Sequence, residues 1–173
     1  EDTISVVNHV RQLSSSSTTQ IGVWGQSMGG MLAILFASRY PGIKAVCTIS
    51  SPLTITRGDD LEKLVPEWKQ KGHLQRINSL GAQDMISYKF VTDSRKFNLK
   101  TAIKSFSSPL LVILGSNDTT VFPTTTRTIY DLANTPKSLV EVNGMPHDYK
   151  EDNKFVAIIN RLSGEFFKKH LHT

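Results

Sequence analysis

The chain has 173 residues, of which 39% are hydrophobic and 20% charged, a composition typical of one globular domain. Although the formal net charge is +5, the basic residues are scattered, and the densest cluster, Lys168-Lys169 beside His170, fits a solvated helix end better than a nucleic-acid site. The single cysteine, Cys47, excludes an internal disulfide, and no apolar run approaches the roughly 18 residues of a spanning helix, so we expect a cytoplasmic protein without membrane contact.

The first predicted element is a helix over residues 1–13, which Asp2 or Thr3 can cap. Its apolar side chains recur at helical spacing: Ile4, Val7, Val10 and Leu13. The spacing therefore predicts one apolar side on this helix.

A tight turn between a strand and a helix is predicted around Ser27. Apolar residues indicate a strand at residues 21–24 before it and a buried helix over about 28–39 after it. In the pattern Gly25-x-Ser27-x-Gly29 the turn is so tight that the residues two before and two after the serine must lack side chains. Ser27 then lies at a helix N-terminus, where unpaired N–H groups and the helix dipole favour a developing negative charge. This context is typical of a nucleophile elbow, and the alternative is an ordinary glycine-rich turn.

The next strand, over residues 43–50, is predicted to be buried on both faces, and strand, helix and strand in this order form a parallel unit. The pattern then loosens over residues 53–108: a helix over 59–71 is interrupted at Pro66, and one or two short helices fall within 78–104. A parallel crossover needs only about a dozen residues, so this segment is predicted to hold the crossover helix and a cap over a site. Side chains that could line a pocket there, with plain packing as the alternative for each, are Trp68, Met85, Tyr88 and Phe90.

The remaining elements continue the alternation of strands and helices. A strand over residues 109–114 is again buried on both faces, a helix over about 124–133 follows it, and the last strand covers 138–142. A terminal helix over about 153–170 buries apolar residues at helical spacing. This order predicts an α/β fold with a mostly parallel sheet flanked by helices, in a single domain over residues 1–173.

Three polar residues each come just past a different predicted strand: Ser27, Asp118 and His147. Because the loops after the carboxyl ends of parallel strands share one edge of a sheet, we expect these side chains to converge. His147 would then take the proton of Ser27 as general base, while Asp118 would hold the imidazole tautomer and stabilise its cation. The order serine, aspartate, histidine is the one expected for an α/β-hydrolase. As alternatives, Asp118 could merely cap a turn and His147 could be a loop residue without a partner, and Asp148 is a weaker candidate for the acid.

At these residues the chain resembles the α/β-hydrolase superfamily. Within it, the chain is similar to small serine esterases of the feruloyl and cinnamoyl esterase type, with a more distant likeness to prolyl-oligopeptidase-type and serine aminopeptidase domains. The stretches that carry the resemblance are Ile21 to Gly30, Tyr40 to Val46, Ser108 to Asp118 and Gly144 to Tyr149. The resemblance implies that Ser27, Asp118 and His147 form the catalytic triad and that residues 53–108 are the cap.

The resemblance also implies roles around the triad. The backbone N–H of Met28 would be an oxyanion-hole donor, and Gln26 and Met145 would lie at the rim of the substrate pocket. Such hydrolases have about four further strands before the first helix predicted here, and a loop after one of them carries a His-Gly motif that completes the oxyanion hole. No His-Gly dipeptide occurs in this chain.

We therefore expect the chain to correspond to the C-terminal two-thirds of a hydrolase, as a fragment, a proteolysed product or a truncated relative. The strand at residues 21–24 would then be an open sheet edge. An open edge predicts a homodimer through that strand, and a missing oxyanion donor predicts weak esterase activity at most.

The leading functional hypothesis is a serine hydrolase that cleaves carboxylic esters through an acyl-enzyme. We expect a small-molecule ester or acyl substrate, no metal or other cofactor, and no nucleic acid partner. Two alternatives stay open. One is a serine peptidase of the same fold, of the prolyl-oligopeptidase or aminopeptidase type, and the other is a truncated, non-catalytic dimerising or binding module.

Overall fold

A computed structural model describes residues 2–13, 20–40, 42–54, 58–77 and 81–171. The chain divides into two compact units, the first made of residues 1–53 and 99–173 and the second of residues 54–98. The second unit is therefore an insertion in the first. It is shorter than the predicted cap segment 53–108, because residues 99–105 form a helix that belongs to the first unit.

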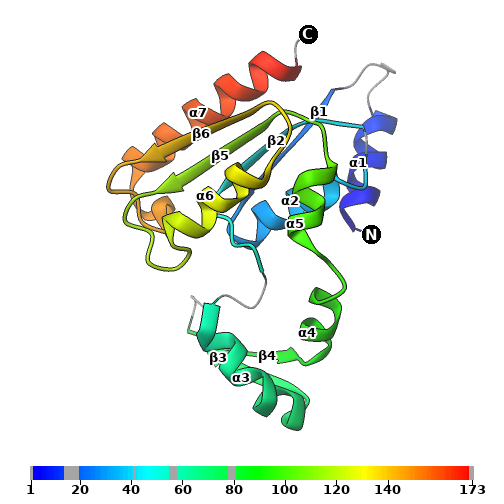
Figure 1. Ribbon diagram of the computed structural model, residues 1–173, viewed down its shortest axis with the longest axis vertical. Coiled ribbons are helices and arrows are strands. Elements are labelled where there is room, and N and C mark those ends of the chain that lie inside the picture. Colours follow the sequence, from blue (N-terminus) through cyan, green and yellow to red (C-terminus); the bar gives the residue numbers. More distant parts are fainter. Residues whose placement is uncertain (1, 14–19, 41, 55–57, 78–80, 172–173) are drawn as a thin grey trace. The chain divides into compact units, whose positions relative to one another are not determined.

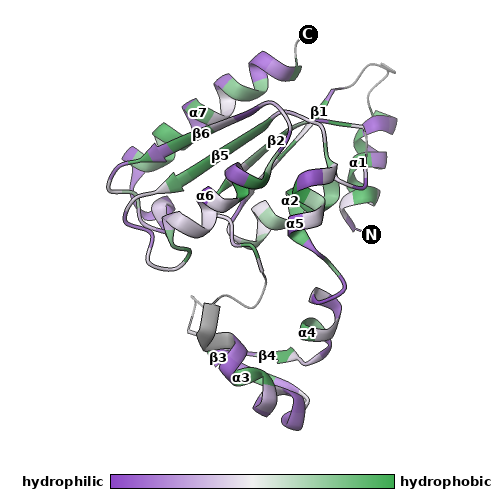
Figure 2. Ribbon diagram, viewed as in Figure 1, coloured by the Kyte–Doolittle hydropathy of each residue, from purple (hydrophilic) through white to green (hydrophobic). Residues whose placement is uncertain are grey.

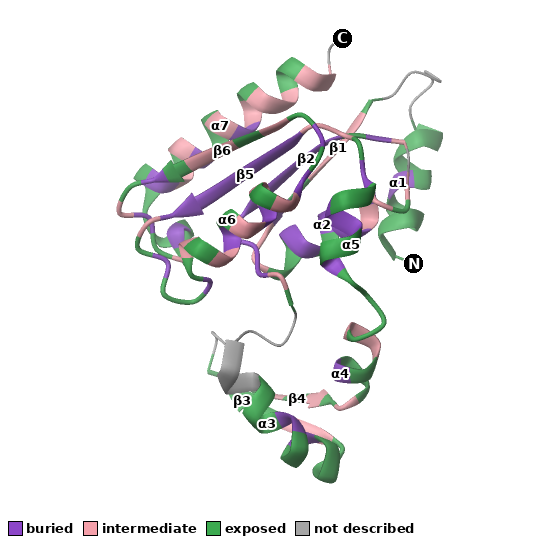
Figure 3. Ribbon diagram, in the orientation of Figure 1, coloured by how far each residue is buried: buried purple, intermediate pink, exposed green. Residues whose placement is uncertain are grey.

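The first unit is built on a four-stranded sheet in which every pairing is parallel (Figure 1). Its strands are β1 (Ile21–Gln26), β2 (Ile43–Ile49), β5 (Leu110–Gly115) and β6 (Lys137–Val142). They lie side by side in the order β1-β2-β5-β6. All of β5 is buried, and so is β2 except Lys44, because helices cover both faces of the sheet (Figure 3). The predicted α/β fold with a mostly parallel sheet is confirmed.

The helices of the first unit lie on opposite faces of this sheet (Figure 1). The helix α7 (Asn153–Leu171), preceded by the 3-10 helix η1 (Tyr149–Glu151), covers one face. On the other face lie α2 (Met28–Ala37) and α6 (Pro123–Leu132), and α5 (Leu99–Ser105) packs against both of these helices. Figure 2 shows hydrophobic residues gathered along the central strands. Beneath α7 the core contains Cys47, Ile49, Leu111, Ile113, Phe155 and Ile159.

The helix α1 (Asp2–Leu13) forms as predicted, but most of its apolar side stays open. Val7 is buried, whereas Ile4, Val10 and Leu13 are 44%, 41% and 73% exposed. The reason is that β1 is an edge strand, which pairs with β2 alone in the part of the chain that the structure describes. An apolar groove of about 440 Å³ runs along this edge between α1, β1 and α2, and its lining includes Val6, Val10, Ile21, Trp24, Leu32 and Phe36.

The second unit combines helices with a hairpin. Its elements are α3 (Gly58–Lys71), β3 (His73–Ile77), β4 (Gln83–Ser87) and α4 (Lys89–Ser94), and the two strands pair antiparallel. A small core joins Val65, Trp68 and Val91. The predicted helices are present, but the hairpin was not predicted. The prediction that Pro66 interrupts the first helix is wrong, because Pro66 lies inside a continuous α3.

Three further findings concern the described residues. None of their helices combines the length and apolar character that crossing a membrane requires. Their His, Cys, Asp and Glu side chains form no group of three suited to a metal ion. Cys47 is completely buried in β2, and burial raises the pKa of its thiol to about 12, so this cysteine is a packing residue and not a nucleophile.

Candidate active site

Ser27 occupies a sharp turn between the end of β1 and the start of α2. Its backbone has φ 54° and ψ −126°, a conformation that residues with a side chain seldom adopt. A hydrogen bond of 2.8 Å from the Ser27 N–H to the Ile49 carbonyl ties the turn to β2. A Cβ atom at Gly25 would lie 2.2 Å from the carbonyl oxygen of Gly29, so only glycine fits at position 25. The turn therefore has the form of a nucleophile elbow.

The prediction that Gly29 must also lack a side chain is wrong for this structure. A Cβ atom at Gly29 would meet no described atom within 4 Å. The close contact is instead the one between the peptide group of Gly29 and Gly25. The second position without room is Gly30, where a Cβ atom would lie 2.9 Å from the Gly25 carbonyl oxygen and 3.0 Å from Cβ of Ser51. Sequence spacing identified the turn, but not which glycines the packing requires.

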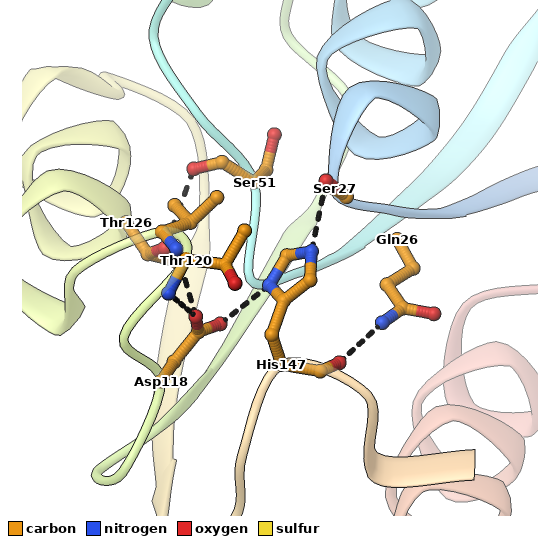
Figure 4. Close-up of polar contacts among 8 residues, drawn as sticks. Gln26, Ser27, Ser51, Asp118, Thr120, Thr126 and His147 are labelled. Carbon is orange, nitrogen blue, oxygen red and sulfur yellow. Dashed lines mark hydrogen bonds and ion pairs between the residues drawn. The ribbon is translucent and has the colours of Figure 1, made fainter. Parts of the chain in front are cut away.

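The structure brings Ser27, Asp118 and His147 together at the carboxyl edge of the sheet (Figure 4). His147 Nε2 lies 3.1 Å from Ser27 Oγ, and His147 Nδ1 lies 2.8 Å from Asp118 Oδ2. The three residues follow β1, β5 and β6, respectively, as the sequence analysis predicted. The imidazole thus bridges a serine hydroxyl and a carboxylate in the arrangement that suits proton transfer from the hydroxyl.

Asp118 is held by hydrogen bonds on both carboxylate oxygens. Oδ1 accepts hydrogen bonds from the backbone N–H groups of Thr120, at 2.9 Å, and Val121, at 2.7 Å, while Oδ2 faces His147. Burial of the carboxyl raises its pKa, but the hydrogen bonds from His147 and from the Val121 N–H, together with the nearby Ser50 hydroxyl, hold the pKa of Asp118 below its ordinary value. An ionised Asp118 accepts a hydrogen bond from the Nδ1–H of His147, and this tautomer leaves the Nε2 lone pair directed at Ser27.

Met28 is the first residue of α2, and its backbone N–H directly follows Ser27. The first N–H groups of a helix have no partner within that helix, and the helix dipole adds positive potential at this end. An oxyanion that forms beside Ser27 would meet this N–H group. The position of Met28 is thus compatible with its predicted role as an oxyanion donor.

Two residues of the first unit were predicted at the rim of a substrate pocket, and the structure buries one of them in the core. Met145 is completely buried in the core with Cys47, Ile113 and Tyr149, so the prediction that it lines a substrate pocket is wrong. Its carbonyl oxygen packs against Gly115, where a Cβ atom would lie 2.2 Å away, so the backbone of this loop lies directly against the end of β5. Gln26 is half-buried, and its amide Nε2 donates a 2.7 Å hydrogen bond to the His147 carbonyl (Figure 4).

The other predicted pocket residues belong to the second unit. Trp68 is 2% exposed, and its indole N–H donates a 2.8 Å hydrogen bond to the Ile86 carbonyl, which favours the packing alternative. Tyr88 is half-buried against the same small core. Met85 is 67% exposed on the surface of its strand. A role for these three side chains in binding substrate stays a prediction.

Two residues after β2 were missed by the sequence analysis. Ser50 is 1% exposed and has φ 46°, a strained backbone beside the triad. Its hydroxyl makes no hydrogen bond of ordinary geometry with a described atom, yet it is near enough to Asp118 to lower the pKa of that carboxyl. The Ser51 carbonyl accepts a 3.3 Å hydrogen bond from Thr126 Oγ1. The sequence did contain a signal for these two serines. They come at the end of one predicted buried strand, just as Asp118 comes after another.

Sequence comparison identifies one family. The sequence pattern of the prolyl oligopeptidase family matches residues 1–171, nearly the whole chain. A comparison with curated proteins gives no significant match.

Solved structures of hydrolases share the fold. The esterase domain of a Rhodothermus marinus protein is 20% identical with a TM-score of 0.65, and the match covers 86% of this chain and 60% of that one. Est1E from Butyrivibrio proteoclasticus, also solved with bound ferulic acid, is 18% identical with a TM-score of 0.72, covering 98% and 68%. A putative dipeptidyl aminopeptidase IV from Bacteroides ovatus is 18% identical with a TM-score of 0.71, covering 98% and 22%.

The chain spans 60% and 68% of the length of the two esterase structures. The architecture agrees with the fold of these hydrolases, and together with the family match over residues 1–171 this confirms the resemblance to the α/β-hydrolase superfamily. Because the family pattern matches residues 1–171, the chain belongs to the prolyl oligopeptidase family.

Proposed function

We propose that the chain is a serine hydrolase that cleaves carboxylic esters, with Ser27 as nucleophile, His147 as general base and Asp118 as the acid that orients the imidazole. The observation that carries the proposal is the pair of hydrogen bonds on His147, 3.1 Å from Nε2 to Ser27 Oγ and 2.8 Å from Nδ1 to Asp118 Oδ2. A non-catalytic binding module has no need of these three side chains in line. This argues against the binding-module alternative.

In the first half of the proposed reaction, Ser27 Oγ attacks the acyl carbonyl carbon while His147 Nε2 takes the hydroxyl proton. The carbonyl electron pair moves to its oxygen, and the Met28 N–H stabilises the resulting oxyanion. When the tetrahedral intermediate collapses, the ester C–O bond breaks and His147 returns the proton to the departing oxygen. An alcohol leaves, and the acyl group stays on Ser27.

In the second half, a water molecule attacks the acyl-enzyme while His147 removes one of its protons. Collapse of this second intermediate breaks the bond to Ser27 Oγ, which takes the proton back from His147. A carboxylic acid leaves, so one turnover consumes an ester and a water and produces an acid and an alcohol. Asp118 stays ionised throughout and stabilises the imidazolium form of His147.

A serine peptidase of the same fold is the second candidate function. It is favoured by the match to the prolyl oligopeptidase family and by the similarity to a putative dipeptidyl aminopeptidase IV. The same three residues would act, but an amine would leave in place of an alcohol. We favour an ester because esters are intrinsically more reactive than amides, and because Met28 is the single oxyanion donor assigned among the described residues.

The experiment that separates the two candidates offers p-nitrophenyl esters of short acids and p-nitroanilides of amino acids and dipeptides to the same preparation. We expect turnover of the esters, little turnover of the anilides, and loss of both in Ser27→Ala. A matched control is Ser38→Ala, because the Ser38 hydroxyl bonds to the Leu35 carbonyl at the end of α2 and takes no part in the site. Anilide hydrolysis at a comparable rate would favour the peptidase, and hydrolysis that survives Ser27→Ala would exclude both mechanisms.

A further inference from the structure

Gln26 connects the strand that ends at the nucleophile with the loop that carries the histidine. It is the last residue of β1, and its amide Nε2 donates a 2.7 Å hydrogen bond to the backbone carbonyl of His147, 121 positions away (Figure 4). Gln26 is half-buried, so solvent competes only in part for this bond. Because the hydrogen bond is made to the backbone of His147 and not to its ring, it restrains the position of the His147 backbone.

The rest of the loop shows why such a contact matters. Up to Met145 the loop is tied to its surroundings: the Gly144 N–H donates to Ser116 Oγ at 2.8 Å, and the Met145 carbonyl accepts the Asn117 N–H at 3.2 Å. Pro146, which precedes His147, has no N–H to donate. The hydrogen bond from the Gln26 amide therefore holds the loop at His147, just after the segment that ends at Met145.

The geometry of the triad leaves little tolerance for movement of this loop. His147 Nε2 lies 3.1 Å from Ser27 Oγ, so a further displacement of a few tenths of an ångström would take the pair out of hydrogen-bonding range. Displacement of a catalytic group by about 1 Å can lower a rate roughly a hundredfold. Since Gln26 precedes Ser27 directly, its bond fixes His147 relative to the same turn that presents the nucleophile.

We propose that Gln26 is a positioning residue of the triad, which holds the backbone of His147 so that Nε2 stays within reach of Ser27 Oγ. This inference rests on the proposed function. It differs from the expectation drawn from the sequence, in which Gln26 lies at the rim of the substrate pocket. A neutral amide suits the task, because it donates to a carbonyl without adding charge beside the imidazole.

Two variants test the role. Gln26→Met keeps the length of the side chain but removes the donor, and Gln26→Glu keeps the shape but turns an oxygen toward the His147 carbonyl. The control is Gln20→Met, at an exposed glutamine just before β1. We expect Gln26→Met to lower kcat roughly tenfold to a hundredfold with KM within about twofold, and Gln20→Met to change neither. Gln26→Glu, which also lacks the donor, should lower kcat to a similar extent with KM within about twofold.

An unchanged kcat in Gln26→Met would overturn the proposal, and so would a raised KM with kcat intact, which would return Gln26 to the substrate pocket. Should thermal unfolding show that the Met variant does not fold, the shape-preserving Gln26→Glu takes its place. An unchanged kcat in that variant would then overturn the proposal.

A spectroscopic measurement separates this proposal from the proposed function. If hydrolysis proves independent of Ser27, the low-field proton NMR signal of the His147 Nδ1–H, which is shared with Asp118, is compared between wild type and Gln26→Met. Loss or broadening of that signal in the variant supports a positioning role. A signal that is identical in the two proteins overturns it.

Discussion

Asp118 Oδ2 and His147 Nδ1 lie 2.8 Å apart, although 29 positions separate the two residues along the chain. They meet because β5 and β6 are neighbours in parallel register, with Gly115 opposite Val142, so the loops after both strands leave the same edge of the sheet. The Asp118 side chain is 1% exposed and that of His147 is 11% exposed. Such a sheltered contact fixes the imidazole in one orientation.

The first prediction concerns this contact. In Asp118→Asn, the amide has no negative charge to stabilise the imidazolium and can present an N–H to Nδ1, which favours the wrong tautomer. We expect kcat to fall by roughly ten-thousandfold with little change in KM, as the role of the acid in serine hydrolysis requires. Steady-state kinetics on a short-chain ester measures the effect. An equally active Asp118→Asn would transfer the acid role to another residue, with Asp148→Asn as the next variant to measure.

The second prediction concerns stability and pH. Because the pKa of Asp118 in the fold lies below its ordinary value of roughly 3.9, ionised Asp118 stabilises the fold above about pH 4, and this contribution is lost as the pH falls through the folded pKa. The difference in unfolding free energy between wild type and Asp118→Asn should thus be widest near neutral pH and should close below about pH 4. Urea unfolding at several pH values measures it, with the exposed Asp148→Asn as control. A difference that stays constant with pH would contradict the assignment.

The sheet and the three polar residues at its edge were predictable because they depend on local patterns. Buried strands such as Leu110–Gly115 are continuous apolar runs, and the residue just past each run must lie at the carboxyl edge of a parallel sheet. The tight turn at Ser27 is likewise visible in its glycines. Each of these inferences needs only a few neighbouring residues.

Other features depend on contacts that no local pattern contains. The hairpin pairs Leu74 with Ile86, but polar residues dominate both strands, so the alternation is weak. Met145 lies in a loop, yet its side chain is part of the core and its backbone packs against Gly115. The Gln26 contact joins residues 121 positions apart through a single amide. These are tertiary effects, and they decide which side chains surround the triad.

The third prediction follows from the turn at Ser27. In Gly25→Ala the new methyl group would lie 2.2 Å from the Gly29 carbonyl oxygen, which forces the backbone to move. We expect a loss of about 1–3 kcal/mol in unfolding free energy and loss of ester hydrolysis. Gly29→Ala is the matched control, because its methyl group meets no described atom within 4 Å, and it should keep both properties. Thermal unfolding and ester turnover measure the pair, and equal damage in the two variants would mean that the account of the turn is wrong.

The fourth prediction concerns the apolar groove beside β1, where Val6 is 61% exposed and Leu32 is 49% exposed. We propose that a second copy of the chain covers it, because two β1 edges related by a twofold axis can satisfy each other's backbone groups. Light scattering after size-exclusion chromatography should show a dimer. Val6→Lys combined with Leu32→Glu should shift it toward monomer. Leu13→Glu, at an exposed position of α1 that does not line the groove, should not. A wild-type chain that is monomeric at micromolar concentration would refute this interface.

The central claim is that Ser27 is the nucleophile, and covalent labelling tests it most directly. The chain is treated with a fluorophosphonate, which phosphonylates an activated serine, and the adduct is located by mass spectrometry of proteolytic peptides. The account predicts one adduct, on Ser27, that is abolished in Ser27→Ala and strongly slowed in His147→Ala, while Ser50 and Ser51 stay unmodified. An adduct on another serine, or labelling of Ser27 at the same rate without His147, would contradict it.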